Sequence, residues 1–80
     1  MASPLAVWLR QQKLRQAELA ALANVDRTDV CRMASGQVAG NRKLRAFLAK
    51  VAPDVLRQQD EYRREWMERI RRQILEGGQR

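Results

Sequence analysis

The chain has 80 residues, of which 45% are apolar and 31% charged, with a formal net charge of +7. This composition is typical of one small folded domain, too short for an enzyme with a large cleft. No apolar run approaches the ~18 residues of a membrane span, and we expect no secretory signal, so a cytoplasmic location is predicted. One cysteine and no histidine exclude an internal disulfide and argue against a metal site; no cofactor is expected.

The first helix is predicted to begin at Pro4, with Ser3 as its N-cap, because proline lacks the N–H that the first helical position leaves unpaired. A stripe at helical spacing should be buried: Leu5, Trp8 and Leu9.

Two short helices joined by a sharp turn are predicted next, over residues 15–23 and 26–34. Asn24 lies at the turn, where asparagine tolerates the left-handed conformation. Asp26 should cap the second of these helices by accepting from amides of its first turn. Their expected buried residues are Leu19, Ala20, Ala23, Val30, Met33 and Ala34.

A loop between Gly36 and Gly40 leads to a fourth predicted helix, which Asn41 caps and Pro53 ends. Its expected apolar stripe is Leu44, Phe47, Leu48 and Val51. A long last helix is predicted from Asp54 to about Glu76, with Gly77-Gly78 as its stop and a frayed tail. Opposite charges four residues apart suit a solvated helix surface: Asp60/Arg64, Glu65/Arg69 and Glu68/Arg72.

The positive charge is unevenly distributed along the chain. Residues 1–53 carry nine Lys and Arg against three Asp and Glu, a net of +6, whereas residues 54–80 carry seven against six, a net of +1. Because the excess lies in the half that contains the two short helices and their sharp turn, we favour phosphate binding over a merely solvated surface.

The segment QAELA (16–20), the turn ANVD (23–26) and Ser35-Gly36 resemble the Cro/C1-type helix-turn-helix family of phage repressors and bacterial regulators. The resemblance covers residues 5–51, and VDRTDVCRM (25–33) is similar to the recognition region of lambda CII-type phage activators. The chain departs from the family pattern at Arg15, which replaces the usual Ser or Thr cap, and at Ala34, which replaces an acidic residue. The glycine usual after Lys13 is missing, so this turn looks one residue short.

The resemblance implies that the helix over 26–34 enters the major groove of double-stranded DNA. Arg27, Thr28 and Arg32 are then the expected base readers, with Ser35 at the rim, since arginine can bond guanine with two hydrogen bonds. Gln16 matches the family position that binds a phosphate at a helix N-terminus. The alternatives are phosphate contact for the two arginines and an ordinary surface role for Gln16.

Other polar residues flank these. For Asp29 we favour stabilisation of its helix N-terminus over acceptance from cytosine N4. Arg42, Lys43 and Arg45 open the fourth helix, where the helix dipole gains nothing from positive charge, so they should flank the DNA backbone. Cys31 lies between the expected readers, and without a partner cysteine a redox role is not favoured.

The last helix carries an apolar face about 30 Å long, which is longer than a domain this small can cover. We therefore expect it to be the main oligomerisation element, although part of it could instead pack against the first helix near Trp8. The expected contact residues are Val55, Tyr62, Trp66, Ile70 and Ile74, with Leu56, Met67 and Leu75 widening the face.

Together these features predict an all-α protein, with a compact four-helix helix-turn-helix domain over residues 1–52 and a long C-terminal helix over 53–80. We expect a sequence-specific DNA-binding transcriptional regulator, repressor or activator, of phage or bacterial type, acting as a homodimer or higher oligomer. Two alternatives are an antitoxin that also grips a toxin and an adaptor that uses its C-terminal helix. No enzyme activity, small-molecule ligand or membrane partner is expected.

Overall fold

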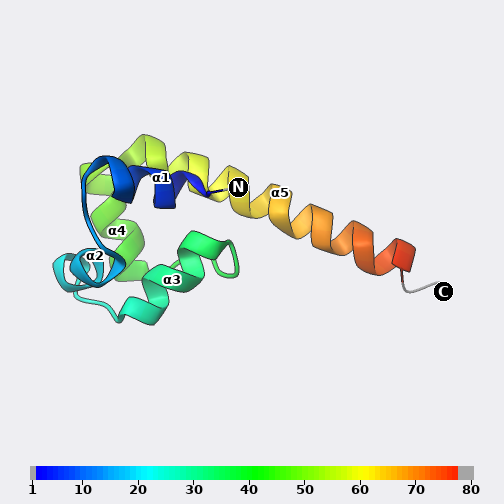
Figure 1. Cartoon of the computed structure of the whole chain (residues 1–80), viewed down its shortest axis with the longest axis horizontal. Helices are drawn as coiled ribbons and strands as arrows, with labels where there is room; N and C mark the ends of the chain where they lie inside the picture. Colours follow the sequence, from blue (N-terminus) through cyan, green and yellow to red (C-terminus); the bar gives the residue numbers. More distant parts are fainter. Residues whose placement is uncertain (1, 78–80) are drawn as a thin grey trace.

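Five helices make up residues 2–77, the part of the chain that the computed structural model describes. They are α1 (Pro4–Gln11), α2 (Gln16–Ala23), α3 (Arg27–Ser35), α4 (Arg42–Val51) and α5 (Pro53–Gly77) (Figure 1). No strand occurs in these residues, so the predicted all-α class is confirmed. The predicted stop at Gly78 and the tail lie outside the described residues, and no helix within residues 2–77 is both long and apolar enough to cross a membrane.

The start of α1 and the turn after it are set by local chemistry. Ser3 Oγ accepts from Ala6 N–H at 3.2 Å and Pro4 is the first helical residue, as predicted. Lys13 has φ 57°, the left-handed conformation that a glycine adopts most easily. Lys13 therefore supplies the left-handed residue of this turn, which contains no glycine.

The α2–α3 unit turns at Asn24, which has φ 59° and ψ 48°, the left-handed conformation predicted for it. At the start of α2, Arg15 has no acceptor to offer, but its N–H donates to Glu18 Oε1 at 2.9 Å, which is one half of a capping box. Asp26 lies at the N-cap of α3 with extended backbone, yet its side chain accepts no capping bond. That part of the prediction is corrected: position and backbone, not a side-chain bond, start α3.

Helix α4 begins and ends where the sequence predicts. Asn41 Oδ1 accepts from Lys43 N–H at 2.8 Å, and the helix stops at Ala52, directly before Pro53. Val51 departs from the predicted stripe, because it is 49% exposed while Leu44 and Leu48 are fully buried.

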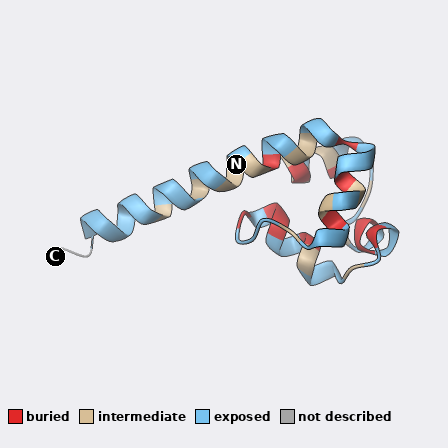
Figure 2. Cartoon of the chain, turned by 180° about the vertical axis from the view of Figure 1, so that it is seen from behind, coloured by how far each residue is buried: buried red, intermediate tan, exposed pale blue. Residues whose placement is uncertain are grey.

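The core lies among the first four helices and the beginning of α5 (Figure 2). Trp8, Leu14, Val25, Phe47, Val55 and Leu56 pack against it while remaining half-buried. Its ten buried members are Leu5, Leu9, Leu19, Ala20, Ala23, Val30, Met33, Ala34, Leu44 and Leu48.

Helix α5 has two halves with different surroundings. Its first half packs against α1 and α4, so packing crosses the domain boundary drawn from the sequence at residue 53. Its second half projects from the body and is largely exposed (Figures 1 and 2). At 1.5 Å per residue, the 25-residue helix is about 37 Å long, most of the 46 Å length of the molecule.

The ion pairs of α5 differ from those expected. None of the three predicted pairs four residues apart forms; within residues 2–77 the ion pairs are Arg45–Asp60 and Arg57–Asp54. Arg45 donates to both Asp60 carboxylate oxygens, at 2.8 and 3.0 Å, and thereby joins α4 to α5. These hydrogen bonds lower the pKa of Asp60 below its ordinary value and raise that of Arg45.

The lowered pKa of Asp60 makes stability pH-dependent. Its stabilising effect is present above the unfolded pKa of about 4 and is lost as pH falls through the lower folded value. We predict that Asp60→Asn lowers the unfolding free energy at pH 7 by at most about 1 kcal/mol, since both side chains are about one-third exposed. Urea unfolding should show that the difference in unfolding free energy between Asp60→Asn and the wild type becomes smaller below about pH 4.

Asp54→Asn is the matched control, because Asp54 pairs with Arg57 at 3.4 Å with both side chains mostly exposed. It should change stability less than Asp60→Asn at pH 7. A deficit of Asp60→Asn that is as large at pH 3 as at pH 7 would contradict the assigned role of the Arg45–Asp60 pair.

Candidate nucleic-acid interface

The outward face of α3 carries most of the expected base readers. Successive residues turn by about 100° around a helix, so Thr28, Arg32 and Ser35 lie opposite the buried Val30, Met33 and Ala34. Arg27 lies at one edge of this face. All four of these residues are exposed, so their side chains are accessible to base edges in a DNA groove.

Two details refine this face. The Ser35 hydroxyl donates to the Arg32 carbonyl at 2.9 Å, so its oxygen is left to act as an acceptor. Cys31 is exposed on the same face and lies between Arg27 and Thr28 in angle, although no part in recognition was predicted for it. Its position makes it a natural site for a chemical label that reports on this surface.

The phosphate-binding candidates surround the two short helices. Gln16 is the first residue of α2 and is half-buried, while Arg42 and Lys43 are exposed in the first turn of α4. The ion pairs of residues 2–77 involve neither Arg42 nor Lys43, nor the arginines of α3. Their charges are therefore uncompensated at short range, which suits an external polyanion.

Arg45 differs from its neighbours in α4. Besides the ion pair with Asp60, it donates to the Ala39 carbonyl at 2.7 Å, and its side chain is about one-third exposed. The expectation that it flanks the DNA backbone is therefore corrected: Arg45 faces inward and holds the loop between α3 and α4.

Asp29 is half-buried at the edge of α3 and turns away from the outward face. It lines a small polar hollow together with Asp26 of the turn and Lys43 of α4. The remaining lining residues are Asn24, Val25 and Asn41. A carboxylate in the first turn of α3, turned away from the outward face, supports the favoured interpretation, helix stabilisation, over base reading.

The candidate oligomerisation residues divide between the two halves of α5. Val55 packs against the core. Tyr62 and Trp66 are half-buried and lie against Gly36, where an added Cβ would meet Tyr62 Cε1 at 3.4 Å and Trp66 Cδ2 at 3.5 Å. The aromatic pair thus covers the end of α3, while the first half of α5 packs against α1, as the alternative expected for part of this helix. Ile70 is half-buried and Ile74 is 66% exposed.

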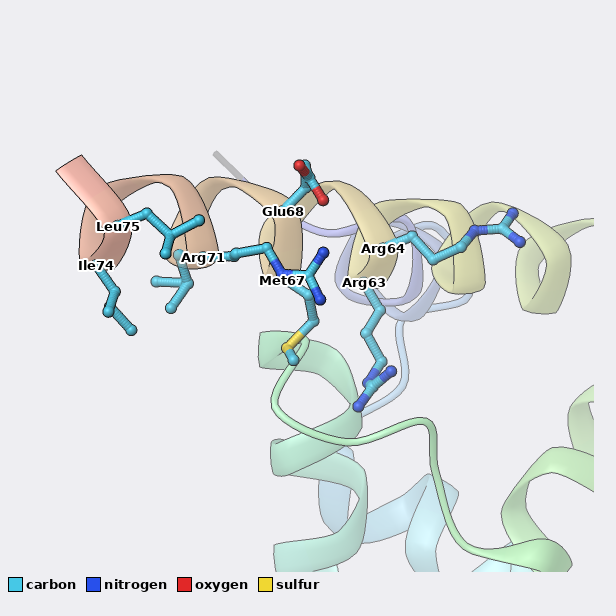
Figure 3. Close-up of a pocket in the computed structure, with 8 residues that line it drawn as sticks. Arg63, Arg64, Met67, Glu68, Arg71, Ile74 and Leu75 are labelled. Atoms are coloured by element: carbon cyan, nitrogen blue, oxygen red, sulfur yellow. The ribbon is translucent and has the colours of Figure 1, made fainter.

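Two shallow hollows flank Ile70 on the projecting half of α5. One is lined by Tyr62, Glu65, Trp66, Arg69, Ile70 and Gln73. The other, shown in Figure 3, is lined by Arg63, Arg64, Met67, Glu68, Ile70, Arg71, Ile74 and Leu75. Met67 and Ile74 point to one side of the helix and Glu68 to the opposite side (Figure 3). A continuous apolar ridge with hollows on both sides fits another helix better than a small molecule.

Gln59 was not among the residues predicted to matter. It is 2% exposed, and its side-chain amide bonds both the Leu5 N–H and the Met33 carbonyl. A signal was present: Gln59 lies four residues after Val55 and three before Tyr62, a polar residue on the apolar face. Such a residue needs hydrogen-bond partners when that face is buried.

No three His, Cys, Asp or Glu side chains within residues 2–77 lie close enough to hold a metal ion. Comparison of the chain with known protein families, with curated protein sequences and with solved structures gave no match.

Proposed function

We propose that this protein is a sequence-specific double-stranded DNA-binding transcriptional regulator, repressor or activator, of phage or bacterial type. The observation that carries the proposal is the exposed outward face of α3, with two unpaired arginines, a threonine and a serine, held by a sharp turn against α2. An exposed helix of this width fits the major groove. The resemblance to Cro/C1-type regulators supports the same reading.

The residues divide by role in this proposal. Arg27, Thr28 and Arg32 read base edges, with Ser35 at the rim, because they project from the exposed side of α3. Gln16, Arg42 and Lys43 position the protein on phosphates and supply affinity that does not depend on sequence.

A second copy of the chain is the proposed partner of the projecting half of α5. Met67, Ile74 and Leu75 are 43%, 66% and 63% exposed, which leaves an apolar face without cover in one copy. Two-fold association through this face would give two α3 helices, and paired recognition helices about 34 Å apart match one turn of DNA.

The exposed apolar face of α5 also fits two other candidate functions. An antitoxin would bind its own promoter through α3 and a toxin through α5, and an adaptor would use α5 alone. An adaptor function does not explain the net charge of +6 over residues 1–53, so the adaptor is a weaker candidate than the antitoxin.

Duplex binding tests the proposed function. A site selected from a random DNA pool should bind more tightly than a scrambled duplex, and log affinity should fall with log salt by about 0.9 per neutralised phosphate. Fluorescence anisotropy at several salt concentrations measures both. Absence of binding to either duplex at low salt would refute the DNA-binding proposal.

Substitutions should separate reading from positioning. We predict that Arg32→Ala costs about 1–3 kcal/mol on the selected site and relaxes preference at particular base pairs. Arg27→Ala should act similarly. Lys43→Ala and Gln16→Ala should weaken all duplexes alike and reduce the salt slope. If Lys43→Ala changed base preference while Arg32→Ala did not, the proposal that the outward face of α3 contacts the bases would be contradicted.

Association is tested at Ile74, which can be changed without touching the core. The intact chain should sediment as a dimer or larger at tens of micromolar, and Ile74→Glu should sediment as a monomer with unchanged helix content. Leu22→Glu is the matched control, since Leu22 is a similarly exposed apolar residue (59%) on α2, and it should associate normally. A monomeric intact chain, or an Ile74→Glu variant that associates normally, would contradict the second-copy proposal.

A further inference from the structure

The buried amide of Gln59 lies where three helices meet. Its Oε1 accepts from Leu5 N–H in the first turn of α1 at 2.9 Å, and its Nε2 donates to the Met33 carbonyl in the last turns of α3 at 2.6 Å. The side chain itself belongs to α5 and is 2% exposed. One side chain therefore joins the first, third and fifth helices away from water.

The chemistry of both partners requires an amide. The first amides of a helix and its last carbonyls have no partners within the helix, and they carry partial positive and negative charge respectively. A glutamine presents an acceptor to the first and a donor to the second while remaining neutral. A carboxylate would face the Met33 carbonyl with like charge. Leucine would leave the Leu5 N–H buried without a bond and the Met33 carbonyl with the Gly36 N–H as its one remaining donor.

Other contacts hold the same end of α3. Tyr62 and Trp66 of α5 lie against Gly36, the residue that ends α3 with φ 90°. Arg45 ties the Ala39 carbonyl of the following loop to Asp60 of α5. The segment 33–39 is thus held to α5 by a hydrogen bond at Met33, by packing at Gly36 and, through Arg45 of α4, at Ala39.

We propose that Gln59 is a positioning residue for DNA recognition: it fixes the C-terminal end of α3 to α5, and so sets the angle at which Thr28 and Arg32 meet the bases. The proposal rests on the proposed DNA-binding function. It also makes α5 the element through which a second copy bound to the projecting half and the bases in the groove influence one another.

Gln59→Glu gives a test with an internal rescue. At pH 8 its carboxylate cannot donate to Met33, whereas the protonated acid has the donor and acceptor of the original amide. At pH 8 we expect the preference for the selected over the scrambled duplex to fall about tenfold, the discrimination of one base contact, with affinity for the scrambled duplex unchanged. Burial and the facing Met33 carbonyl disfavour the charged form at this position, so near pH 5 the acid should be protonated and the preference should recover toward that of the wild type measured in parallel.

Val55→Ala is the matched control, because Val55 packs on the core one turn earlier in α5 without a bond to α3. It should lower stability while keeping the duplex preference. Amide hydrogen exchange in the free proteins adds a readout that needs no DNA: exchange over residues 33–37 should be faster in Gln59→Glu than in Val55→Ala at pH 8. If Gln59→Glu does not fold at pH 8, Gln59→Asn, whose shorter amide cannot span both partners, replaces it.

The outcomes separate this proposal from the proposed function. The positioning role would be overturned if Gln59→Glu at pH 8 kept the duplex preference and the amide hydrogen exchange of the wild type. It would also be overturned if Val55→Ala lost as much duplex preference as Gln59→Glu. If the wild type binds no duplex, the DNA-binding function fails, and exchange over residues 33–37 alone decides whether Gln59 fixes α3: faster exchange than in Val55→Ala supports it, and equal exchange overturns it.

Discussion

The amide of Gln59 bonds two buried backbone groups, one on α1 and one on α3, and thereby fixes both helices to α5. Helices α2 and α3 have eight and nine residues, shorter than the roughly 12–15 at which an isolated helix becomes even marginally stable in water. Their stability must come from packing. The position of α3 is accordingly a property of the whole core, and α5 is the part of that core bonded directly to its end.

Local signals account for what the sequence predicted well. Ser3 with Pro4, Asn24, Asn41 and Pro53 each act within a few residues, so helix starts and stops could be placed without knowing the tertiary structure. The same holds for the buried stripes of α2 and α3, because spacing along a helix fixes which side chains share a face. The exposure of the candidate residues on α3 followed from that spacing.

Long-range partners account for what the sequence did not predict. Gln59 bonds residues 54 and 26 positions away, and Asp60 pairs with Arg45 instead of the arginine four residues along its own helix. Arg45 bonds both carboxylate oxygens of Asp60 and also a loop carbonyl. Such a bidentate pair is stronger than a solvated pair between Asp60 and Arg64 on the surface of one helix. The role of Arg45 was misjudged for the same reason, since charge at a helix start does not reveal which way the side chain turns.

The two halves of α5 thus lie in different environments. The first half of α5 is tied to the core by Gln59 and Asp60, while the second half exposes an apolar ridge around Ile70 and Ile74. Because a helix is stiff along its axis, a partner on the ridge acts on the same rigid element that holds the end of α3. In the proposed function, association and recognition would be linked by geometry, since whatever fixes the direction of α5 also restricts the angle of α3. Any coupling between the two would work equally in both directions.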